Sequence, residues 1–249
     1  MKETDIIFIC TKILERLSII DYEKIDDNRM VVEGKTSIYN KQLIFPVKNG
    51  GVDRLSEQEL RQLFIEEFKD LHKDLYYSIE TPTKTQYKFG KKFNDISVSE
   101  EGRSASLDMC IYRKVENAFK RELNIEFKYD NVSLYKIGKD IFKLMHEDQN
   151  GAFILLLKNT DSGTLCNKEK TGVLDKLHES FKKFGSYLKV SKSLELVIIS
   201  LEDDTLIYRK AFQDDLNNLE NVFAINSDGY GNIKTVSEES GWTKYKINQ

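Results

Sequence analysis

Two short, almost uninterrupted apolar segments, separated by an amphipathic stretch, constrain the fold of this chain more than any other feature. Residues 152–157 read Ala-Phe-Ile-Leu-Leu-Leu, and residues 194–199 read Leu-Glu-Leu-Val-Ile-Ile. Between them, residues 172–188 carry apolar side chains at helical spacing. Strands this apolar are typical of a sheet that is buried on both faces. The sequence therefore predicts an α/β protein with helices on both sides of its sheet.

The segments before residue 152 extend this pattern. Helical spacing predicts helices, and alternation of polar and apolar residues predicts strands. The predicted helices are 4–18, 56–76, 133–147 and 172–188, and the predicted strands of the core are 84–90, 105–113, 122–129, 151–158 and 193–200. Ser56, followed three residues later by Glu59, has the spacing of a capping box and marks a helix start. From residue 56 the order is helix, three strands, helix, strand, helix, strand.

Three regions follow from this order. Residues 1–55 are expected to form an N-terminal unit of one helix and short strands, with hairpins over 29–48 and a turn at 49–51. Residues 56–200 are expected to form the core. Residues 201–249 are expected to form a C-terminal extension with a short acidic helix and a hairpin around Asp228 and Gly229.

Composition excludes several classes of protein. Of the 249 residues, 40% are hydrophobic and 32% are charged, which is too apolar for a disordered chain. No apolar run is long enough to span a membrane, and charged residues among the first twenty argue against a signal peptide. Three scattered cysteines suggest neither a disulfide framework nor a zinc site, so a cytoplasmic location is expected.

The charge distribution is uneven. The formal net charge is −3, which does not favour a nucleic-acid partner. Between Lys84 and Lys128, however, there are ten Lys and Arg residues and seven Asp and Glu residues, whereas from Glu195 onward there are five Lys and Arg residues and ten Asp and Glu residues. A local basic surface is thus compatible with the acidic total.

The strand at 122–129 contains the residues that are most suggestive of chemistry. Because side chains alternate along a strand, Glu126 and Lys128 share one face, and Ile125 and Phe127 share the other. On the preceding strand, Asp108 lies opposite a face shared by Leu107, Met109 and Ile111. If the two strands are neighbours, Asp108 and Glu126 converge. Two close carboxylates repel each other, and Mg²⁺ relieves that repulsion, while Lys128 is placed to orient or deprotonate a metal-bound water.

This arrangement resembles the PD-(D/E)xK nuclease superfamily: an Asp in one strand, Glu-x-Lys in the next, and then a helix and an apolar strand. The resemblance covers about residues 56–200 and implies a restriction-endonuclease-like, three-layer α/β core with a central mixed sheet in αβββαβ order. It implies that Asp108 and Glu126 bind the metal with the backbone carbonyl of Phe127, and that Lys128 is catalytic. Leu107 stands where the family name has proline.

Further residues are candidates for the same site. On the predicted helix 56–76, Glu67 falls within about 20° of Leu60, inside the apolar stripe. The resemblance implies a metal-directed acidic residue on this helix, so Glu67 is a candidate ligand; a buried salt bridge to a Lys or Arg is the alternative. Tyr135 and Lys139, on the predicted helix 133–147, are candidates for binding substrate.

The function expected from these residues is Mg²⁺-dependent hydrolysis of phosphodiester bonds, with DNA as the substrate and Mn²⁺ as a substitute metal. Restriction, defence and repair are all compatible settings, and a homodimer would supply two active sites for double-strand cutting. Two alternatives stay open: a catalytically degenerate member of the same fold that acts as a binding or assembly module, and an unrelated α/β interaction protein. In the simplest structural alternative, Glu126 and Lys128 form a solvated pair on a half-exposed strand.

Overall fold

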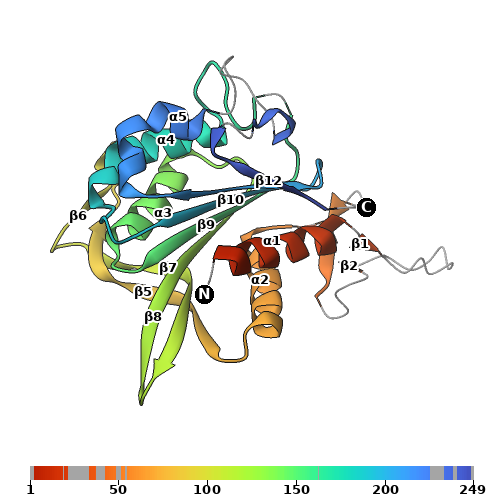
Figure 1. The fold of residues 1–249 in the computed structure, drawn as a ribbon, viewed down its shortest axis with the longest axis horizontal. Coiled ribbons are helices and arrows are strands. Elements are labelled where there is room, and N and C mark those ends of the chain that lie inside the picture. Colours follow the sequence, from red (N-terminus) through yellow and green to blue (C-terminus); the bar gives the residue numbers. More distant parts are fainter. Residues whose placement is uncertain are drawn as a thin grey trace.

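A computed structural model of the chain describes residues 3–18, 20–21, 34–37, 43–48, 52–53, 55–161, 163–224, 233–237 and 240–247. Within them, a mixed sheet of eight strands runs in the order β12-β11-β10-β9-β8-β7-β5-β6 (Figure 1). The strands are β5 (Leu75–Lys88), β6 (Ser97–Val98), β7 (Arg103–Val115), β8 (Ala118–Tyr129), β9 (Asn150–Leu157), β10 (Leu194–Ser200), β11 (Thr205–Ala211) and β12 (Thr243–Lys246). β8, β9 and β10 are parallel neighbours, and the other neighbouring pairs are antiparallel.

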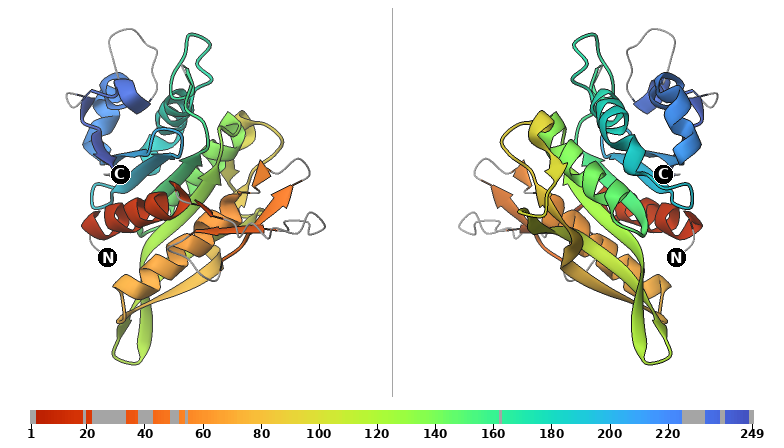
Figure 2. Two further views of the ribbon diagram at one scale, coloured as in Figure 1. Left: turned by 90° about the vertical axis from the view of Figure 1, so that its right-hand side faces the viewer. Right: turned by 90° about the vertical axis from the view of Figure 1, so that its left-hand side faces the viewer.

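Helices cover both faces of this sheet (Figures 1 and 2). They are α1 (Glu3–Ser18), α2 (Glu57–Leu71), α3 (Leu134–His146), α4 (Val173–Phe184) and α5 (Leu219–Phe223). Side chains of α1 and α2 build one core with one face of the sheet, and side chains of α3, α4 and α5 build a second core with the opposite face. The predicted α/β class is therefore confirmed, and β9 and β10 are buried along nearly their whole length, as their apolar sequences require.

Short elements complete the described chain. They are the strands β1 (Ile20–Asp21), β2 (Gly34–Ser37), β3 (Phe45–Lys48) and β4 (Val52–Asp53) and the 3₁₀ turns η1 (Phe93–Asp95), η2 (Gly185–Tyr187), η3 (Gln213–Asn218) and η4 (Ile233–Thr235). β1 to β4 form a separate small antiparallel sheet. Pairing of β2 with β3 agrees with the hairpin expected within 29–48. The turn at 49–51 and the hairpin around Asp228 and Gly229 lie outside the described residues.

The predicted helix 56–76 is too long at its C-terminal end. Ser56 is the N-cap, and its side chain accepts a hydrogen bond from the amide of Gln58, but the helix ends at Leu71. From Leu75 the chain enters β5, a strand of 14 residues that pairs with β7 and includes Pro82. Leu71 and Leu75 keep helical spacing in the sequence, so the apolar pattern predicted that the helix would continue past Leu71. Pairing with β7, a tertiary contact, decides otherwise.

The terminal regions join the same layers as the core. α1 packs with α2 under the sheet, and β11 and β12 add two strands to its β10 edge. Trp242, which is buried, donates from its indole nitrogen to the carbonyl of Val222, 3.0 Å away. The expected strand at 84–90 coincides with β5 only over residues 84–88, because β5 begins at Leu75 and ends at Lys88. β11 is a strand that sequence reasoning did not separate from the extension.

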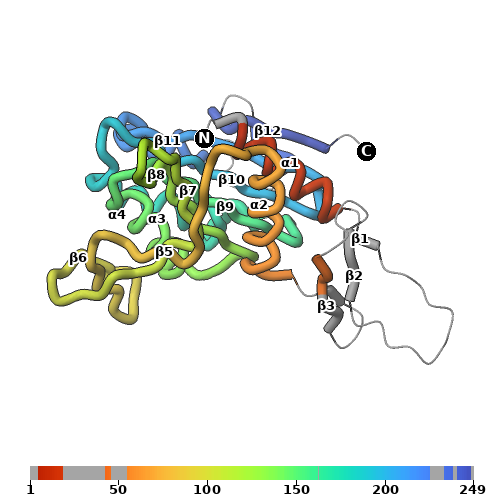
Figure 3. Tube along the Cα trace, turned by 90° about the horizontal axis from the view of Figure 1, so that it is seen from below, coloured from red at the N-terminus to blue at the C-terminus, as the bar shows by residue number. Residues whose placement is uncertain are grey.

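The hairpin of β7 and β8 projects past the helices (Figure 2). At the edge of the sheet opposite β12, the 89–102 segment that carries η1 and β6 extends from the end of β5 (Figure 3). η1 lies against α3: a side chain at Gly138 of α3 would place its Cβ 2.5 Å from the ring of Phe93. This docking connects the edge of the sheet to the helix that also borders the candidate site.

Candidate functional site

The candidate site lies where β7 and β8 separate. Their last paired residues toward this end are Met109 and Ile125. Beyond them, Oδ2 of Asp108 accepts a hydrogen bond from the backbone N–H of Phe127 at 2.7 Å. A side chain thus replaces a backbone partner, and the carboxylate of Asp108 is fixed beside the run of residues 126–128.

The same separation corrects one sequence prediction. Leu107 was expected on the face of β7 that carries Met109 and Ile111. Instead, Leu107 packs into the core of α3 and α4, whereas Met109 and Ile111 pack against α1 and α2. Regular alternation therefore breaks at Asp108, where the ladder with β8 has ended and the side chain of Asp108 accepts a hydrogen bond from the amide of Phe127.

Alternation on β8 is as predicted. Glu126 and Lys128 share the face toward α3, with exposures of 1% and 8%, and Ile125 and Phe127 belong to the opposite core. These exposures contradict the solvated-pair alternative. The ring of Phe64 on α2 packs edge-on against the ring of Phe127, with centroids 5.3 Å apart, so α2 is held across this part of β8.

Helix α3 supplies two charged groups that meet this face. Nζ of Lys143 lies 2.5 Å from Oε1 of Glu126 and 3.0 Å from Oδ1 of Asp140. It also donates to the carbonyl of Ser106 on β7, at 2.8 Å. Lys143 therefore joins the helix to both strands of the site. Asp140 and Lys143 are 5% and 7% exposed.

Lys128 occupies the centre of the remaining contacts. Its Nζ lies 2.9 Å from Oδ2 of Asp140 and 3.4 Å from Oε2 of Glu57, and it donates to the carbonyl of Phe127 at 2.8 Å. Glu57 is the first residue of α2, directly after the N-cap Ser56. The site thus draws on α2, β7, β8 and α3.

Burial and the neighbouring charges shift the pKa values of this cluster in different directions. Burial raises the pKa of Glu126 well above its ordinary value, and Lys143 only partly opposes this effect. For Asp140, burial also acts to raise the pKa, but Lys143 and Lys128 more than offset it and hold the pKa below its ordinary value. Burial acts to lower the pKa values of Lys128 and Lys143, yet Asp140 and the neighbouring carboxylates raise both. Both lysines are therefore cations, and burial favours a proton on Glu126 more than on Asp140.

Glu67 is held by a different partner. Oε1 of Glu67 lies 2.6 Å from Nη1 of Arg16 on α1, and Glu66 binds the other terminal nitrogen of the same guanidinium at 2.5 Å. Arg16 is 5% exposed. The structure therefore shows the salt-bridge alternative at Glu67, and Glu57 is the carboxylate of α2 that reaches Lys128.

Tyr135 and Lys139 lie on the outer side of α3, against the segment after β5. The hydroxyl of Tyr135 donates to the carbonyl of Gly90 at 3.0 Å. Nζ of Lys139 lies 5.0 Å from the ring centre of Tyr135 and 5.4 Å from that of Phe89. Both residues border the helix that carries Asp140 and Lys143, without entering their cluster of contacts.

The oxygens near Asp108 have the chemistry that Mg²⁺ prefers, since carboxylates and carbonyls are its usual protein ligands. Asp108 binds the amide of Phe127, so its carboxylate lies beside Glu126 and the carbonyl of Phe127. With Asp140, the site contains three carboxylates, and its two lysines are Lys128 and Lys143. Among the described residues, however, no three His, Cys, Asp or Glu side chains already form a metal-binding group. The chemistry of these oxygens suits a divalent cation, but in this arrangement Lys143 binds the carboxylate of Glu126 and Lys128 binds the carbonyl of Phe127.

Sequence reasoning did not identify Asp140, Lys143 or Glu57. A signal for the first two existed, because Asp140 stands three residues after Ile137 and four before Leu144, inside the apolar stripe of α3. The same argument drew attention to Glu67. No comparable signal marked Glu57, whose position depends on how α2 crosses the sheet.

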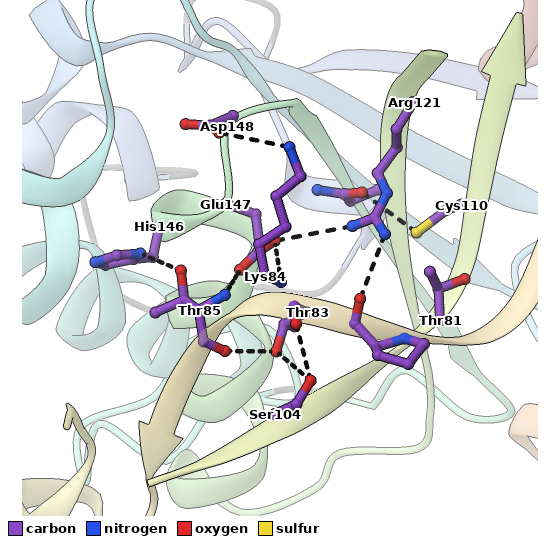
Figure 4. A network of polar contacts seen from close by, with 12 residues as sticks. Thr81, Thr83, Lys84, Thr85, Ser104, Cys110, Arg121, His146, Glu147 and Asp148 are labelled. Carbon is purple, nitrogen blue, oxygen red and sulfur yellow. Dashed lines mark hydrogen bonds and ion pairs between the residues drawn. The ribbon is translucent and has the colours of Figure 1, made fainter. Parts of the chain in front are cut away.

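A second polar network, around Glu147, lies at the C-terminal end of α3 (Figure 4). The carboxylate of Glu147 accepts hydrogen bonds from the amides of Lys84 and Thr85, at 3.0 and 3.1 Å, and from the hydroxyl of Tyr87 at 3.1 Å. Arg121 of β8 forms an ion pair with it at 3.8 Å. These contacts connect the end of α3 to the irregular part of β5. In that part, the pairing of β5 with β7 shifts register between Pro82 and Gln86. They fix the position of α3 over the sheet.

Comparisons of the chain with protein-family models, with curated proteins and with solved structures gave no match. In the described part of the chain, no helix has both the length and the apolar character needed to cross a membrane.

Proposed function

We propose that this protein is a metal-dependent nuclease that hydrolyses phosphodiester bonds, with DNA as its substrate. The observation that carries the proposal is the hydrogen bond from the amide of Phe127 to Asp108, which brings the carboxylate of one strand beside Glu126 and Lys128 of the next. When the two-residue strand β6 is set aside, the order α2, β5, β7, β8, α3, β9 is the αβββαβ order implied by the resemblance to the PD-(D/E)xK superfamily, which supports the proposal.

Each residue has a distinct role in the proposed reaction. Asp108, Glu126 and the carbonyl of Phe127 would hold Mg²⁺, or Mn²⁺ in its place, and the metal would supply a polarised water and offset the charge on the phosphate. Lys128, which is paired with Asp140 and Glu57, would orient the water and stabilise developing negative charge. Asp140 holds Lys128 in place.

The contacts of Lys143 support a second candidate function. They neutralise Glu126 and Asp140 in the absence of metal, as expected for a catalytically degenerate fold in which the polar cluster is purely structural and the protein acts as a binding or assembly module. The two candidates differ in one requirement. A nuclease must release Glu126 from Lys143 when metal binds, whereas the degenerate module keeps that pair at every metal concentration.

A cleavage assay tests the proposal. Plasmid, linear duplex and single-stranded DNA are incubated with Mg²⁺ or Mn²⁺ and either the wild-type protein, Asp108→Asn, Lys128→Met or the control Lys158→Ala. The asparagine retains an oxygen that accepts from the amide of Phe127 and loses only the charge. We expect Asp108→Asn and Lys128→Met to reduce cleavage by about 10²–10⁴-fold. Lys158 is exposed, so its variant should match wild type.

Metal binding is measured separately by calorimetry with Mn²⁺. Wild type is expected to bind, and Glu126→Gln is expected to lose the binding heat while its melting curve shows a folded protein. Absence of cleavage in wild type, or equal cleavage by wild type and Asp108→Asn, contradicts the nuclease. Absence of cleavage together with absence of metal heat favours the binding module.

A further inference from the structure

The segment that leaves β5 alternates cations with aromatic rings. Residues 88–93 read Lys-Phe-Gly-Lys-Lys-Phe, and Lys88, Lys91 and Lys92 are exposed. Gly90 has a φ of 62°, a left-handed conformation that glycine adopts without strain, and this turn directs the lysines outward. We call the surface made by this segment, by Arg103 and by the outer side of α3 the basic platform; its cations are Lys88, Lys91, Lys92, Arg103, Lys136 and Lys139.

The basic platform is a built surface rather than a loose loop. Tyr135 bonds to the carbonyl of Gly90, and Lys139 lies over the rings of both Tyr135 and Phe89. Lys183 of α4 donates to the carbonyl of Phe93 at 2.6 Å. Figure 3 shows the segment at the end of the molecule opposite β1, β2 and β3. The lysines are therefore presented from a fixed position.

Charge on this surface is positive although the protein as a whole is acidic. Its six cations face three carboxylates of the same region, Asp95, Glu100 and Glu101. Oδ2 of Asp95 accepts hydrogen bonds from the backbone amides of Lys91 and Lys92, at 3.1 and 3.0 Å, and so part of its charge is used to hold the turn. The complement of such a surface is a polyanion.

A hollow of about 380 Å³ opens beside the platform, lined by Tyr87, Phe89, Lys88, Glu101 and Arg103 among others. The rings of Tyr87 and Phe89 are stacked, with an interplanar angle of 5° and centroids 5.6 Å apart. Aromatic rings next to cations are the usual receptors for unpaired bases, because every base has a flat face that stacks. In a duplex the bases are not free to enter such a hollow.

We propose that the basic platform binds single-stranded DNA, with its phosphates on the lysines and one unpaired base in the hollow beside Phe89. This inference rests on the proposed function and specifies the form of its substrate. Arg103 and Asp108 are five positions apart on β7, a span of about 17 Å. That is about five nucleotides at the 3.4 Å rise of one strand in a duplex, and fewer in an extended strand. DNA held on the platform therefore reaches the candidate site along β7 and α3.

Fluorescence anisotropy with a labelled 20-nucleotide poly(dT) strand tests this inference. The full chain is used in EDTA, so that binding is measured without cleavage. The variant Lys88→Ala/Lys91→Ala/Lys92→Ala should weaken binding at least tenfold and reduce the slope of log K against log salt by about 2, since each phosphate contact contributes about 0.7 for a single strand. The control Lys12→Ala/Lys69→Ala/Lys73→Ala changes lysines on α1, on α2 and directly after α2, and it should stay within twofold of wild type.

Two variants of the ring separate stacking from packing. Phe89→Leu keeps apolar volume and loses the flat ring, and we expect it to weaken binding by about 5- to 150-fold. Phe89→Tyr keeps a flat ring and should bind with wild-type affinity. Equal affinity of wild type and the triple-lysine variant overturns the proposal, as does tighter binding of a 20-base-pair duplex with no effect of Phe89→Leu. A protein that binds poly(dT) in this way but cuts no DNA overturns the proposed nuclease and leaves the platform intact.

Discussion

Nζ of Lys143 on α3 lies 2.5 Å from Oε1 of Glu126 on β8, and both side chains are buried. This contact ties the helix to the strand that carries the candidate catalytic residues. A buried ion pair contributes little to stability relative to an apolar pair, but removing one partner leaves a charge without compensation. Lys143 and Glu126 therefore depend on each other, because loss of either side chain leaves the other buried without its partner.

Lys143→Met is expected to lower the free energy of unfolding by about 3–5 kcal/mol at neutral pH, because Glu126 and Asp140 lose their shared cation. Urea denaturation measures the loss. Lys136→Met, at an exposed position of the same helix, should change stability by less than about 0.5 kcal/mol. Adding Glu126→Leu to Lys143→Met should recover part of the loss. Equal stability of the two single variants would show that the pair has no structural role.

Glu67→Gln and Glu57→Gln are expected to affect different properties: the first lowers stability, and the second lowers DNA cleavage. The first weakens the buried contact with Arg16 and should reduce stability by about 1–3 kcal/mol, while Mn²⁺ binding stays within twofold of wild type. The second removes a half-exposed partner of Lys128 and should reduce DNA cleavage with a stability change below about 1 kcal/mol. Urea denaturation, Mn²⁺ calorimetry and the cleavage assay together test the pair. Loss of Mn²⁺ binding in Glu67→Gln would restore this residue as a metal ligand.

Glu147→Gln should destabilise the protein by about 1.5–3 kcal/mol, because the amide replaces one of the two acceptor oxygens that bind Lys84, Thr85 and Tyr87 by a donor. Asp148→Asn is the matched control. Asp148 is exposed and pairs with Lys189 at the surface, so its variant should change stability by less than about 1 kcal/mol. Thermal melting of both variants provides the comparison, and identical melting curves would contradict a structural role for the network in Figure 4.

Asp203 is expected to make stability depend on pH. Its burial acts to raise the pKa, but hydrogen bonds from Lys234, Thr160 and Ser200 lower the pKa below its ordinary value. A folded pKa below the unfolded one, which is about 3.9, gives stability that is present above the unfolded pKa and lost as pH falls through the folded pKa. Asp203→Asn should therefore be less stable than wild type at pH 6, and this difference should shrink below about pH 4. Urea denaturation across this range tests it; a difference that does not change with pH would show that the carboxylate charge is not the cause.

Much of the layer arrangement was predictable because it depends on local periodicity. Near-continuous apolar sequence in β9 and β10 requires burial on both faces, and the spacing in α1, α3 and α4 requires one apolar side. Alternation along β8 placed Glu126 and Lys128 on one face for the same reason. These features are repeated over many residues, so single exceptions do not obscure them.

The sequence by itself determined the α/β class and the polar face of β8, and it brought Asp108 near that face only on the condition that the two strands are neighbours. Only the tertiary structure decided that α2 stops at Leu71, that Asp108 leaves the strand ladder to bind the amide of Phe127, and that Arg16 takes Glu67 while Glu57 reaches Lys128. The reason is physical. Periodicity fixes which side of an element is apolar, but the partner of each buried charge depends on how separate elements cross, and residues 51 and 71 positions apart in the chain make those contacts.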